Sequence, residues 1–317
     1  MTPDPVIPLT EGSLSLGTLS DPLLVDPDPP LLATVREAYR AAFPDLVDPD
    51  LDALRVAADG KGIDQSRSGG VSGGPRTTLT VLAAEAAVDA VTHGFHAASR
   101  FAALTESGAV ELLTLSAPQP NAVLAARETG CVLVEGENMP TNGTASERIG
   151  GTERSASDRT WHRVGNDPTL RDRYAESIAT AQTRHLRTPS RHRMYRAFDD
   201  RCGEAVATDV IRVLDADPAL SRDDLVGPRI RAYAVGARHE LLDYDLRRAC
   251  EDAGIGSPST FTRVKRRLID AGVIGTERVP QPVGRPRERI AAKPDLADPP
   301  LSAVGETIRV ALENETE

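Results

Sequence analysis

Aromatic residues and long apolar stretches are both scarce in this sequence of 317 residues. Phe, Trp and Tyr together make up 3% of it, although 40% of the residues are hydrophobic, so Leu, Val and Ala must supply most of the core. No apolar run approaches the roughly 20 residues that a membrane-spanning helix needs, and the N-terminus lacks the basic and apolar regions of a signal peptide. We therefore expect a cytoplasmic protein with no membrane partner.

Cysteine and metal-ligand patterns are equally sparse. The three cysteines, Cys131, Cys202 and Cys250, are odd in number and far apart, which excludes both a disulfide framework and a CxxC zinc site. His93 and His96 have the spacing of two metal ligands on a helix, but no HExxH motif, cysteine pair or nearby carboxylate completes a site. We expect reduced thiols and no metal or other cofactor.

Catalytic signatures are absent as well. The sequence contains no GxSxG elbow, no Walker phosphate-binding loop and no GxGxxG motif between a strand and a helix. The glycine run at residues 69–74 lacks the Lys-Ser/Thr pair of a phosphate-binding loop, and no histidine begins a His-x-Lys motif. We therefore expect a protein that is not an enzyme. An enzyme with an appended winged helix is the least favoured alternative.

Lysine is nearly missing although the chain is highly charged. Only Lys61, Lys265 and Lys293 occur among the 37 basic residues, and the formal net charge is −10. An acidic surface with few lysines suits solubility at high salt, where repulsion between surface charges is screened. A GC-rich genome would also favour Arg over Lys. The composition therefore favours a protein from a halophile, and it leaves open which of the two causes operates.

The apolar pattern predicts an α+β protein with several segments. Residues 1–140 mix strand and helix patterns and are predicted to form an α/β sensor-like domain, and residues 141–185 a loop and helical linker. Residues 186–290 contain a helical segment, amphipathic over 191–215 with a break near Gly203, and then a winged helix. The acidic tail, residues 291–317, is predicted to be either disordered or a short helix over 304–312.

Within the first domain, the pattern assigns individual elements. The strands are expected at 23–25, 54–57 and 110–115, a helix at 31–42, a hairpin over 121–126 and 131–135, and glycine-containing loops at 59–76 and 140–160.

A helix-turn-helix pattern spans residues 241–271. The first helix, 241–252, ends in the turn Ala-Gly-Ile-Gly at 253–256, and Ser257-Pro258 then provide a cap and a first helical residue for the second helix. Apolar residues at spacings of three, four and three form one buried stripe on that second helix: Phe261, Val264, Leu268 and Ala271. In such motifs the second helix enters the major groove of DNA.

The face opposite this stripe carries the candidate DNA contacts. Hydroxyls near the helix N-terminus are placed to bind phosphate, where the helix dipole favours an anion. Arg263 and Arg266 are placed to fork onto guanine, whereas Lys265 and Arg267 are better placed for phosphates. The candidate residues on this helix are Ser257, Ser259, Thr260, Thr262, Arg263, Lys265, Arg266 and Arg267.

A wing is predicted directly after the second helix. Residues 276–279 and 287–290 have strand patterns, and the proline-rich segment 280–286 joins them. Arg285 lies between Gly284 and Pro286 on an extended backbone, which suits insertion into a narrow minor groove, and Arg287 completes the candidate contacts of the wing.

Local charge supports a nucleic-acid partner. Residues 255–290 hold eight basic and three acidic residues, a net charge of +5, which leaves −15 for the rest of the chain. A basic island in an acidic protein is the pattern of phosphate binding. A winged helix that contacts protein or RNA remains the alternative. A second basic cluster at residues 184–196 fits flanking phosphates and a solvated helix start equally well.

At these residues the sequence resembles the TbsP-type regulators of haloarchaea. The resemblance spans roughly residues 185–290 and rests on five stretches: Leu186–Arg191, Cys202–Val206, Glu251–Lys265, Ala271–Pro280 and Val283–Arg287. It implies transcriptional control of central carbon metabolism genes and an N-terminal α/β sensor-like domain. That domain would be similar to phospholipase-D-like modules, without their catalysis, and would be the place for a small-molecule effector. We expect double-stranded DNA as the partner of a homodimer that reads two half-sites about one helical turn apart.

Overall fold

The computed structural model describes most of the chain: residues 4–9, 12–60, 75, 77–127, 129–135, 159–165, 169–221, 224–280 and 286–314. The glycine-containing loops expected at 59–76 and 140–160 lie almost entirely outside these residues. The chain divides into an N-terminal unit, residues 1–43, 73–91 and 108–184, and a C-terminal unit, residues 44–72, 92–107 and 185–317. Among the described helices, none combines the length and the apolar character that a bilayer crossing demands.

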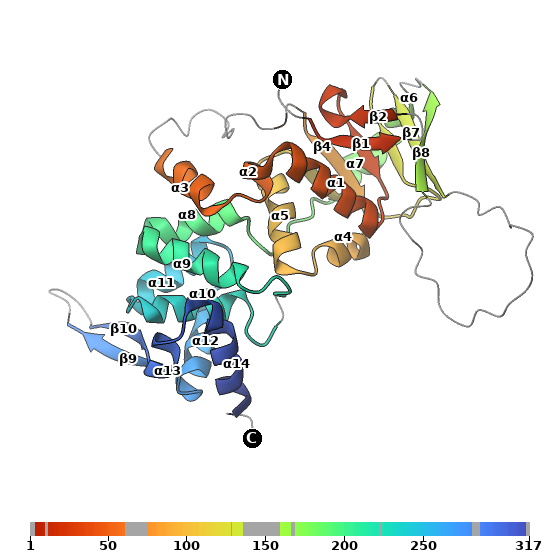
Figure 1. Cartoon of the computed structure of the whole chain (residues 1–317). Helices are drawn as coiled ribbons and strands as arrows, with labels where there is room; N and C mark the ends of the chain where they lie inside the picture. Colours follow the sequence, from red (N-terminus) through yellow and green to blue (C-terminus); the bar gives the residue numbers. More distant parts are fainter. Residues whose placement is uncertain are drawn as a thin grey trace, which may run out of the picture. The chain divides into compact units, whose positions relative to one another are not determined.

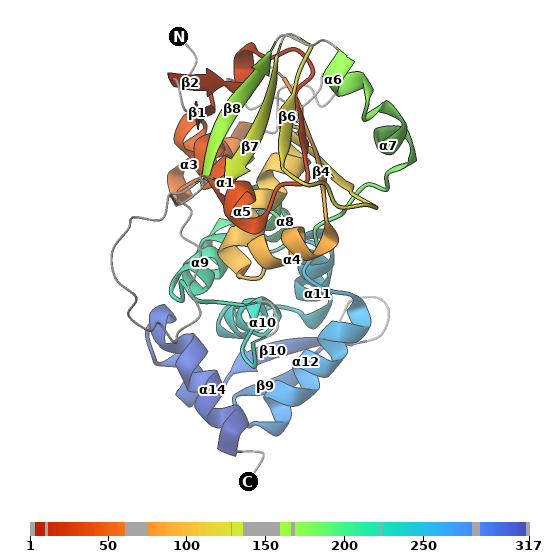
Figure 2. The same cartoon turned by 90° about the vertical axis from the view of Figure 1, so that its right-hand side faces the viewer.

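A six-stranded mixed sheet forms the centre of the N-terminal unit, in the order β5-β4-β3-β6-β7-β8 (Figure 2). β3, β4 and β5 are parallel, and the remaining neighbours are antiparallel. Every residue of β3, β4 and β6 is buried, which is why these strands are apolar apart from Thr80 in β4. The strands are β3 (Leu23–Val25), β4 (Leu79–Ala83), β5 (Val110–Thr114), β6 (Val123–Ala125), β7 (Gly130–Glu135) and β8 (Arg159–Gly165).

Helices cover this sheet. α1 (Pro29–Ala42) begins at Asp28, which accepts a hydrogen bond from the amide of Leu31 at 2.9 Å, and it packs on α4 (Glu85–Val91). The short helices α6 (Thr169–Asp172) and α7 (Ala175–Thr180) lie beside the sheet (Figure 2) and pack on apolar side chains of β3 to β6. The hairpin β1 (Val6–Leu9) and β2 (Gly12–Ser15) and the 3-10 turn η1 (Leu16–Thr18) complete the unit.

Two sequence-based expectations for residues 1–185 are wrong in detail. Residues 54–57 are not a strand but part of helix α3 (Leu51–Asp59), because Asp50 caps the helix and Leu54 and Ala58, four residues apart, bury one face. The segment assigned to a linker, 141–185, contains β8, which pairs with β7 and buries Trp161. The strand at 23–25, the helix at 31–42 and the β6–β7 hairpin are confirmed.

The C-terminal unit is mainly helical (Figure 1). Its core is one large cluster of buried apolar residues to which almost every element contributes. The long helix expected over 191–215 is two helices, because Gly203 adopts a positive φ of 90° between them. The helices before the helix-turn-helix are α2 (Pro44–Val47), α3, α5 (Phe95–Glu106), α8 (Arg191–Cys202), α9 (Glu204–Asp215) and α10 (Pro228–Arg238).

A winged helix follows within the same unit. It consists of α10, α11 (Asp243–Asp252), α12 (Pro258–Asp270) and the antiparallel hairpin β9 (Ile274–Val279) and β10 (Arg287–Ala292). Leu242 forms an isolated bridge to Arg289, and the amide of Ile290 donates to the carbonyl of Leu241 at 2.9 Å. The segment between α10 and α11 therefore adds a third, one-residue strand to the wing sheet. The predicted winged helix is confirmed.

The C-terminal tail is part of this domain. α13 (Pro294–Ala297), the 3-10 turn η4 (Leu301–Ala303) and α14 (Val304–Asn314) follow β10, so the alternative of a short helix is confirmed over that of disorder. Ile308 is fully buried, and Gly305 lies so close to the buried Arg231 that a Cβ would come within 2.6 Å of its guanidinium. The folded domain therefore continues past residue 290, where the sequence analysis ended it.

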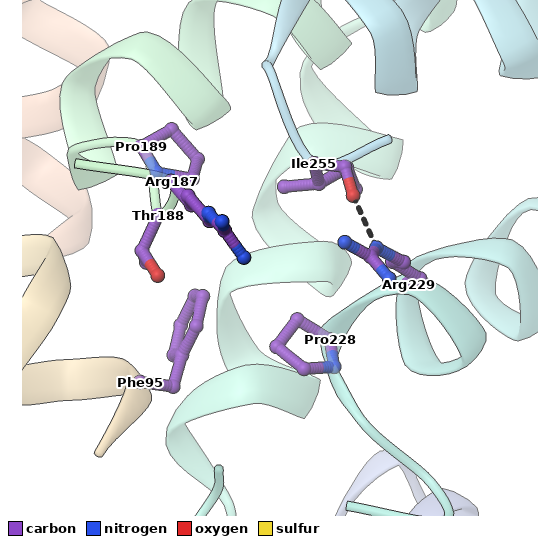
Figure 3. Close-up of a pocket in the computed structure, with 7 residues that line it drawn as sticks. All are labelled: Phe95, Arg187, Thr188, Pro189, Pro228, Arg229 and Ile255. Atoms are coloured by element: carbon purple, nitrogen blue, oxygen red, sulfur yellow. Dashed lines mark hydrogen bonds between the residues drawn. The ribbon is translucent and has the colours of Figure 1, made fainter. Parts of the chain in front are cut away.

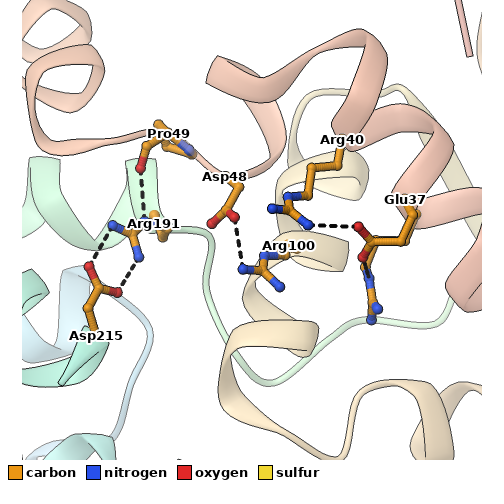
Figure 4. A network of polar contacts seen from close by, with 8 residues as sticks. Glu37, Arg40, Asp48, Pro49, Arg100, Arg191 and Asp215 are labelled. Atoms are coloured by element: carbon orange, nitrogen blue, oxygen red, sulfur yellow. Dashed lines mark hydrogen bonds and ion pairs between the residues drawn. The ribbon is translucent and has the colours of Figure 1, made fainter. Parts of the chain in front are cut away.

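Ion pairs hold helices α8 and α5 in this unit. Arg191 forks onto the carboxylate of Asp215 at the end of α9, and its Nε donates to the carbonyl of Pro49 at 3.1 Å (Figure 4). Arg100 in α5 pairs with Asp48 at 2.8 Å. Arg191, a member of the basic cluster at residues 184–196, is thus held by internal contacts, which does not favour a phosphate contact for this residue.

Replacement of Ile308 tests whether the tail belongs to the core. Ile308→Ala removes a fully buried side chain and should lower the free energy of unfolding by about 2–5 kcal/mol. Val310→Ala is the matched control, because Val310 lies on the same helix and is 47% exposed, so its change should stay within about 0.5 kcal/mol. Urea unfolding followed by circular dichroism measures both. Equal stabilities would show that α14 does not pack as described.

Candidate nucleic-acid interface

The turn before α12 is built by local chemistry. Gly254 has a φ of +79°, and a Cβ there would also approach the Arg193 guanidinium to 3.2 Å. The Ser257 hydroxyl caps α12 by accepting from the amide of Thr260 at 3.4 Å, and Pro258 occupies the first turn. At the other end, Gly272 adopts a φ of +73° and ends the helix. These four positions place α12 as the sequence predicted.

One face of α12 is buried in the core. Phe261 and Leu268 are fully buried and Val264 is 8% exposed, whereas Ala271, also assigned to the stripe, is half-buried. The Phe261 ring stacks on Tyr233 of α10, with a centroid distance of 6.1 Å and an interplanar angle of 11°. This contact fixes the rotation of α12 about its axis, and so determines which residues face outward.

The opposite face presents two arginines to solvent. Arg263 is exposed and has no ion pair within the described part of the chain. Arg266 is 85% exposed, and its Nε lies 3.6 Å from Asp270 one turn later, a distance that is too long for a hydrogen bond. An exposed pair of this kind is worth little in stability and is readily exchanged for a phosphate or a base. Both guanidinium groups therefore remain available to a ligand.

Hydroxyl groups cluster at the N-terminus of α12. The Ser257 hydroxyl lies 3.0 Å from the hydroxyls of both Ser259 and Thr260. The Thr262 hydroxyl donates to the carbonyl of Pro258 at 3.1 Å and accepts from Arg247 of α11 at 3.1 Å. Ser257 and Ser259 are exposed. The hydroxyl side chains predicted from the sequence therefore lie together at the N-terminal end of the helix, where the helix dipole favours an anion.

Lys265 does not point to solvent, and the expected phosphate contact is wrong for it. Its side chain is 15% exposed, and its ammonium pairs with Asp243 at 3.0 Å and with Glu288 of β10 at 2.5 Å. The position lies at the margin of the buried stripe, so the long side chain reaches across to two carboxylates. Lys265 therefore joins α12 to both α11 and the wing.

Asp243 is the centre of this buried network. Its carboxylate is 12% exposed and accepts from Lys265, from Arg247 at 2.8 Å and from the hydroxyl of Tyr233. Burial, followed by the nearby negative charge of Asp243, raises the pKa of Tyr233 well above its usual value, so the phenol stays protonated and donates. Three helices thus meet at one carboxylate, and Lys265 links it to one strand of the wing.

The wing carries an arginine contact that the sequence did not reveal. The Arg287 guanidinium lies 5.0 Å from the ring centroid of Tyr244, and Arg248 lies 5.7 Å from the same ring. Tyr244 is 50% exposed, so this cluster forms a cationic surface beside the wing. Tyr244 and Arg248 have no signal in the sequence beyond their position on the outer face of α11. Arg285 lies outside the described residues, and Arg267 is half-buried on α12.

Two further arginines hold the turn between α11 and α12. Arg229 donates to the carbonyl of Ile255 at 2.6 Å, and Arg193 donates to that of Asp252 at 3.2 Å. Figure 3 shows Arg187 and Arg229 at a crevice beside this turn. The crevice encloses only about 10 Å³, enough for about one water molecule, so it does not hold a small-molecule ligand.

No metal chemistry is apparent at this surface. Across the segments that the structure describes, no group of three or more His, Cys, Asp or Glu side chains is arranged to hold a metal ion. The interface consists instead of guanidinium groups, hydroxyls and an aromatic ring. Those groups recognise phosphates and base edges.

Comparison with known proteins identifies this domain. Residues 190–310 match the family model of the C-terminal helix-turn-helix domain of TbsP-like transcriptional regulators. No curated protein sequence and no solved structure matches the chain. The C-terminal unit therefore carries a TbsP-like helix-turn-helix domain, as the sequence resemblance implied, and the matched region extends into α14 as far as residue 310.

Removal of the Asp243 carboxylate tests the network. Asp243→Ala leaves Lys265 and Arg247 without their shared partner and should lower the free energy of unfolding by about 3–5 kcal/mol. Asp270→Ala removes an exposed carboxylate on α12 and should cost at most about 1 kcal/mol. Chemical unfolding at fixed salt measures both variants. A stability of Asp243→Ala close to that of Asp270→Ala would refute the central role of this carboxylate.

Proposed function

We propose that this chain, with its TbsP-like helix-turn-helix domain, is a DNA-binding transcriptional regulator that inserts α12 into the major groove of its operator. The observation that carries the proposal is the exposure of Arg263 and Arg266 on the face of α12 opposite the buried stripe. A guanidinium group forks onto the O6 and N7 atoms of guanine, the commonest specific contact between proteins and DNA. The proposal assigns the chain no catalytic step.

The remaining candidate residues divide between two roles. Ser257, Ser259, Thr260 and Thr262 bind a phosphate at the N-terminus of α12, where the helix dipole adds to their hydrogen bonds. Arg267 and Arg287 bind the flanking phosphates, and Arg285, between Gly284 and Pro286 in the sequence, enters the minor groove. Lys265 acts indirectly, because its two ion pairs hold the wing beside α12.

Local charge supports duplex binding by this acidic chain. Residues 255–290 carry a net charge of +5, although Lys265 is neutralised internally by Asp243 and Glu288. The exposed part of that charge lies on α12 and the wing, the two elements that contact DNA in winged-helix proteins. RNA or a partner protein is the competing ligand for the same surface, and a binding comparison separates them.

We extend the proposal to the target genes and the N-terminal sensor-like domain that the TbsP resemblance implies, and to the location and the homodimer that the sequence analysis predicts. The regulator acts in the haloarchaeal cytoplasm as a homodimer, controls genes of central carbon metabolism, and responds to a small-molecule effector at its N-terminal unit. Light scattering tests the oligomeric state, and genome-wide mapping of bound DNA tests the set of target genes. A monomer that binds its operator with full affinity would contradict the dimer.

Alanine variants of the two exposed arginines test base reading. Arg263→Ala or Arg266→Ala should each reduce discrimination between operator and scrambled duplex by about 1–3 kcal/mol, because a bidentate contact to a base is lost. Arg309→Ala is the matched control, since Arg309 is a half-exposed arginine on α14 with a similar loose carboxylate neighbour at 3.5 Å. Fluorescence anisotropy at one fixed salt concentration measures the affinities. Unchanged discrimination in both variants would remove α12 from base reading.

The wing arginine should behave differently. Arg287→Ala should weaken binding to operator and scrambled duplex alike, and should reduce the slope of log affinity against log salt by about one, because one phosphate contact disappears. The measurement is a salt titration of both duplexes and of single-stranded RNA of the same sequence. Stronger binding of wild-type protein to the RNA than to either duplex would instead assign the surface to RNA.

A further inference from the structure

A cavity opens at the edge of the N-terminal sheet where two parallel strands end. It has a volume of about 350 Å³ and is lined by Leu82 near the end of β4 and by Thr114, Leu115 and Ser116 at the end of β5. The second wall is the end of α7 and the residues after it. Ligands of open α/β sheets bind outside the carboxyl ends of the parallel strands, and their pockets span roughly 300–1,000 Å³. Position and size both fit a small-molecule site.

The wall formed by α7 is fixed to the sheet. The amide of Thr114 donates to the carbonyl of Gln182 at 2.9 Å, and the amide of Arg184 donates to that of Leu112 at 2.8 Å. Segment 182–184 therefore runs beside β5 as an added edge. Ile178 and Ala181 also pack on the apolar face of the sheet. The cavity is therefore bounded by backbone pairing and core packing on both sides.

The lining is polar but carries no charge. Its side chains offer four hydroxyls, one amide and three apolar groups, and none of these lining groups ionises. The lining residues are Leu82, Thr114, Leu115, Ser116, Ser177, Thr180, Ala181 and Gln182. Arg184, two residues beyond the lining, is engaged by Asp89 at 2.6 Å and Glu85 at 3.4 Å. A phosphate or carboxylate ligand would lose its hydration without gaining a cation, which is unfavourable.

We propose that this cavity binds an uncharged, polyhydroxylated small molecule of about the size of a monosaccharide. Hydroxyl and amide groups donate to and accept from ligand hydroxyls, and Leu82 and Leu115 contact the ligand's C–H surface. The binding site does not depend on the DNA-binding proposal. Only its role as the effector site of the regulator rests on that proposed function.

Calorimetric titration of the full chain without DNA tests the site. The probes are glucose and ribose, each paired with its phosphate ester, glucose 6-phosphate and ribose 5-phosphate. We expect saturable binding of at least one of the two sugars and weaker binding of its ester, because the lining offers no cation. No saturable binding of either sugar, or tighter binding of an ester than of its parent sugar, would overturn the proposal.

A pair of matched threonine variants locates the ligand. Thr180→Val removes a hydroxyl from the lining and should weaken sugar binding about three- to tenfold, the effect of one lost hydrogen bond. Thr34→Val is the control: both threonines lie on exposed helix faces, and each hydroxyl donates to a carbonyl four residues back, at 2.9 Å for Thr180 and 3.0 Å for Thr34. Gln182→Ala, which keeps the backbone pairing with Thr114, should weaken binding similarly.

Circular dichroism confirms that each variant is folded before titration. Binding that both Thr180→Val and Gln182→Ala leave unchanged would place the sugar elsewhere and refute the site. An operator titration with and without the bound sugar is a separate measurement. Wild-type protein that binds no operator either with or without the sugar would refute the proposed function, while sugar binding would still support the cavity.

Discussion

The buried carboxylate of Asp243 and the donors around it hold the helix-turn-helix domain in a single arrangement. A carboxylate removed from water costs several kcal/mol unless hydrogen bonds and opposite charges replace its hydration. Here Tyr233, Arg247 and Lys265 supply them from three successive helices, and Lys265 continues the contacts to Glu288 in the wing. Displacement of α12 would separate Lys265 from both Asp243 and Glu288, and displacement of α10 would remove the hydrogen bond from Tyr233. The network therefore couples the orientation of α12 to that of the wing, and both orientations decide what the surface can bind.

Several arginine side chains in this domain hold backbone carbonyls and so stabilise its turns. Arg193 and Arg229 hold the carbonyls of the turn before α12, and a single nitrogen of Arg238 holds the carbonyls of Leu296 and Pro299 at 2.7 Å each. A guanidinium suits this role because it offers five donors in a fixed plane and always keeps its charge. The number of arginines in a segment therefore overstates the charge available to DNA. Exposure, as at Arg263, is the better guide to a contact.

Local chemistry made much of the domain predictable from the sequence. The cap at Ser257 and the apolar spacing through Leu268 depend on neighbours within a few residues, so α12 and its outward face could be placed without coordinates. Lys265 could not be assigned, because its two carboxylate partners are 22 and 23 residues away in sequence. The strand predicted at residues 54–57 was wrong for another reason, because four residues are too few to distinguish the periodicity of a strand from that of a helix. β8 was missed because a loop-like segment of polar composition precedes it.

The rest of the chain is acidic and repels a polyanion such as DNA. The strength of this repulsion depends on the ionic strength. At about 1 M salt the Debye length is about 3 Å, so repulsion between DNA and the −15 charge outside residues 255–290 is screened at any distance beyond contact. The same screening removes long-range attraction and weakens phosphate contacts through counterion competition. Contacts made at hydrogen-bond distance, such as an arginine fork on a base edge, lose less. At the high salt that the composition suits, selectivity would therefore depend more on Arg263 and Arg266 than on the basic patch as a whole.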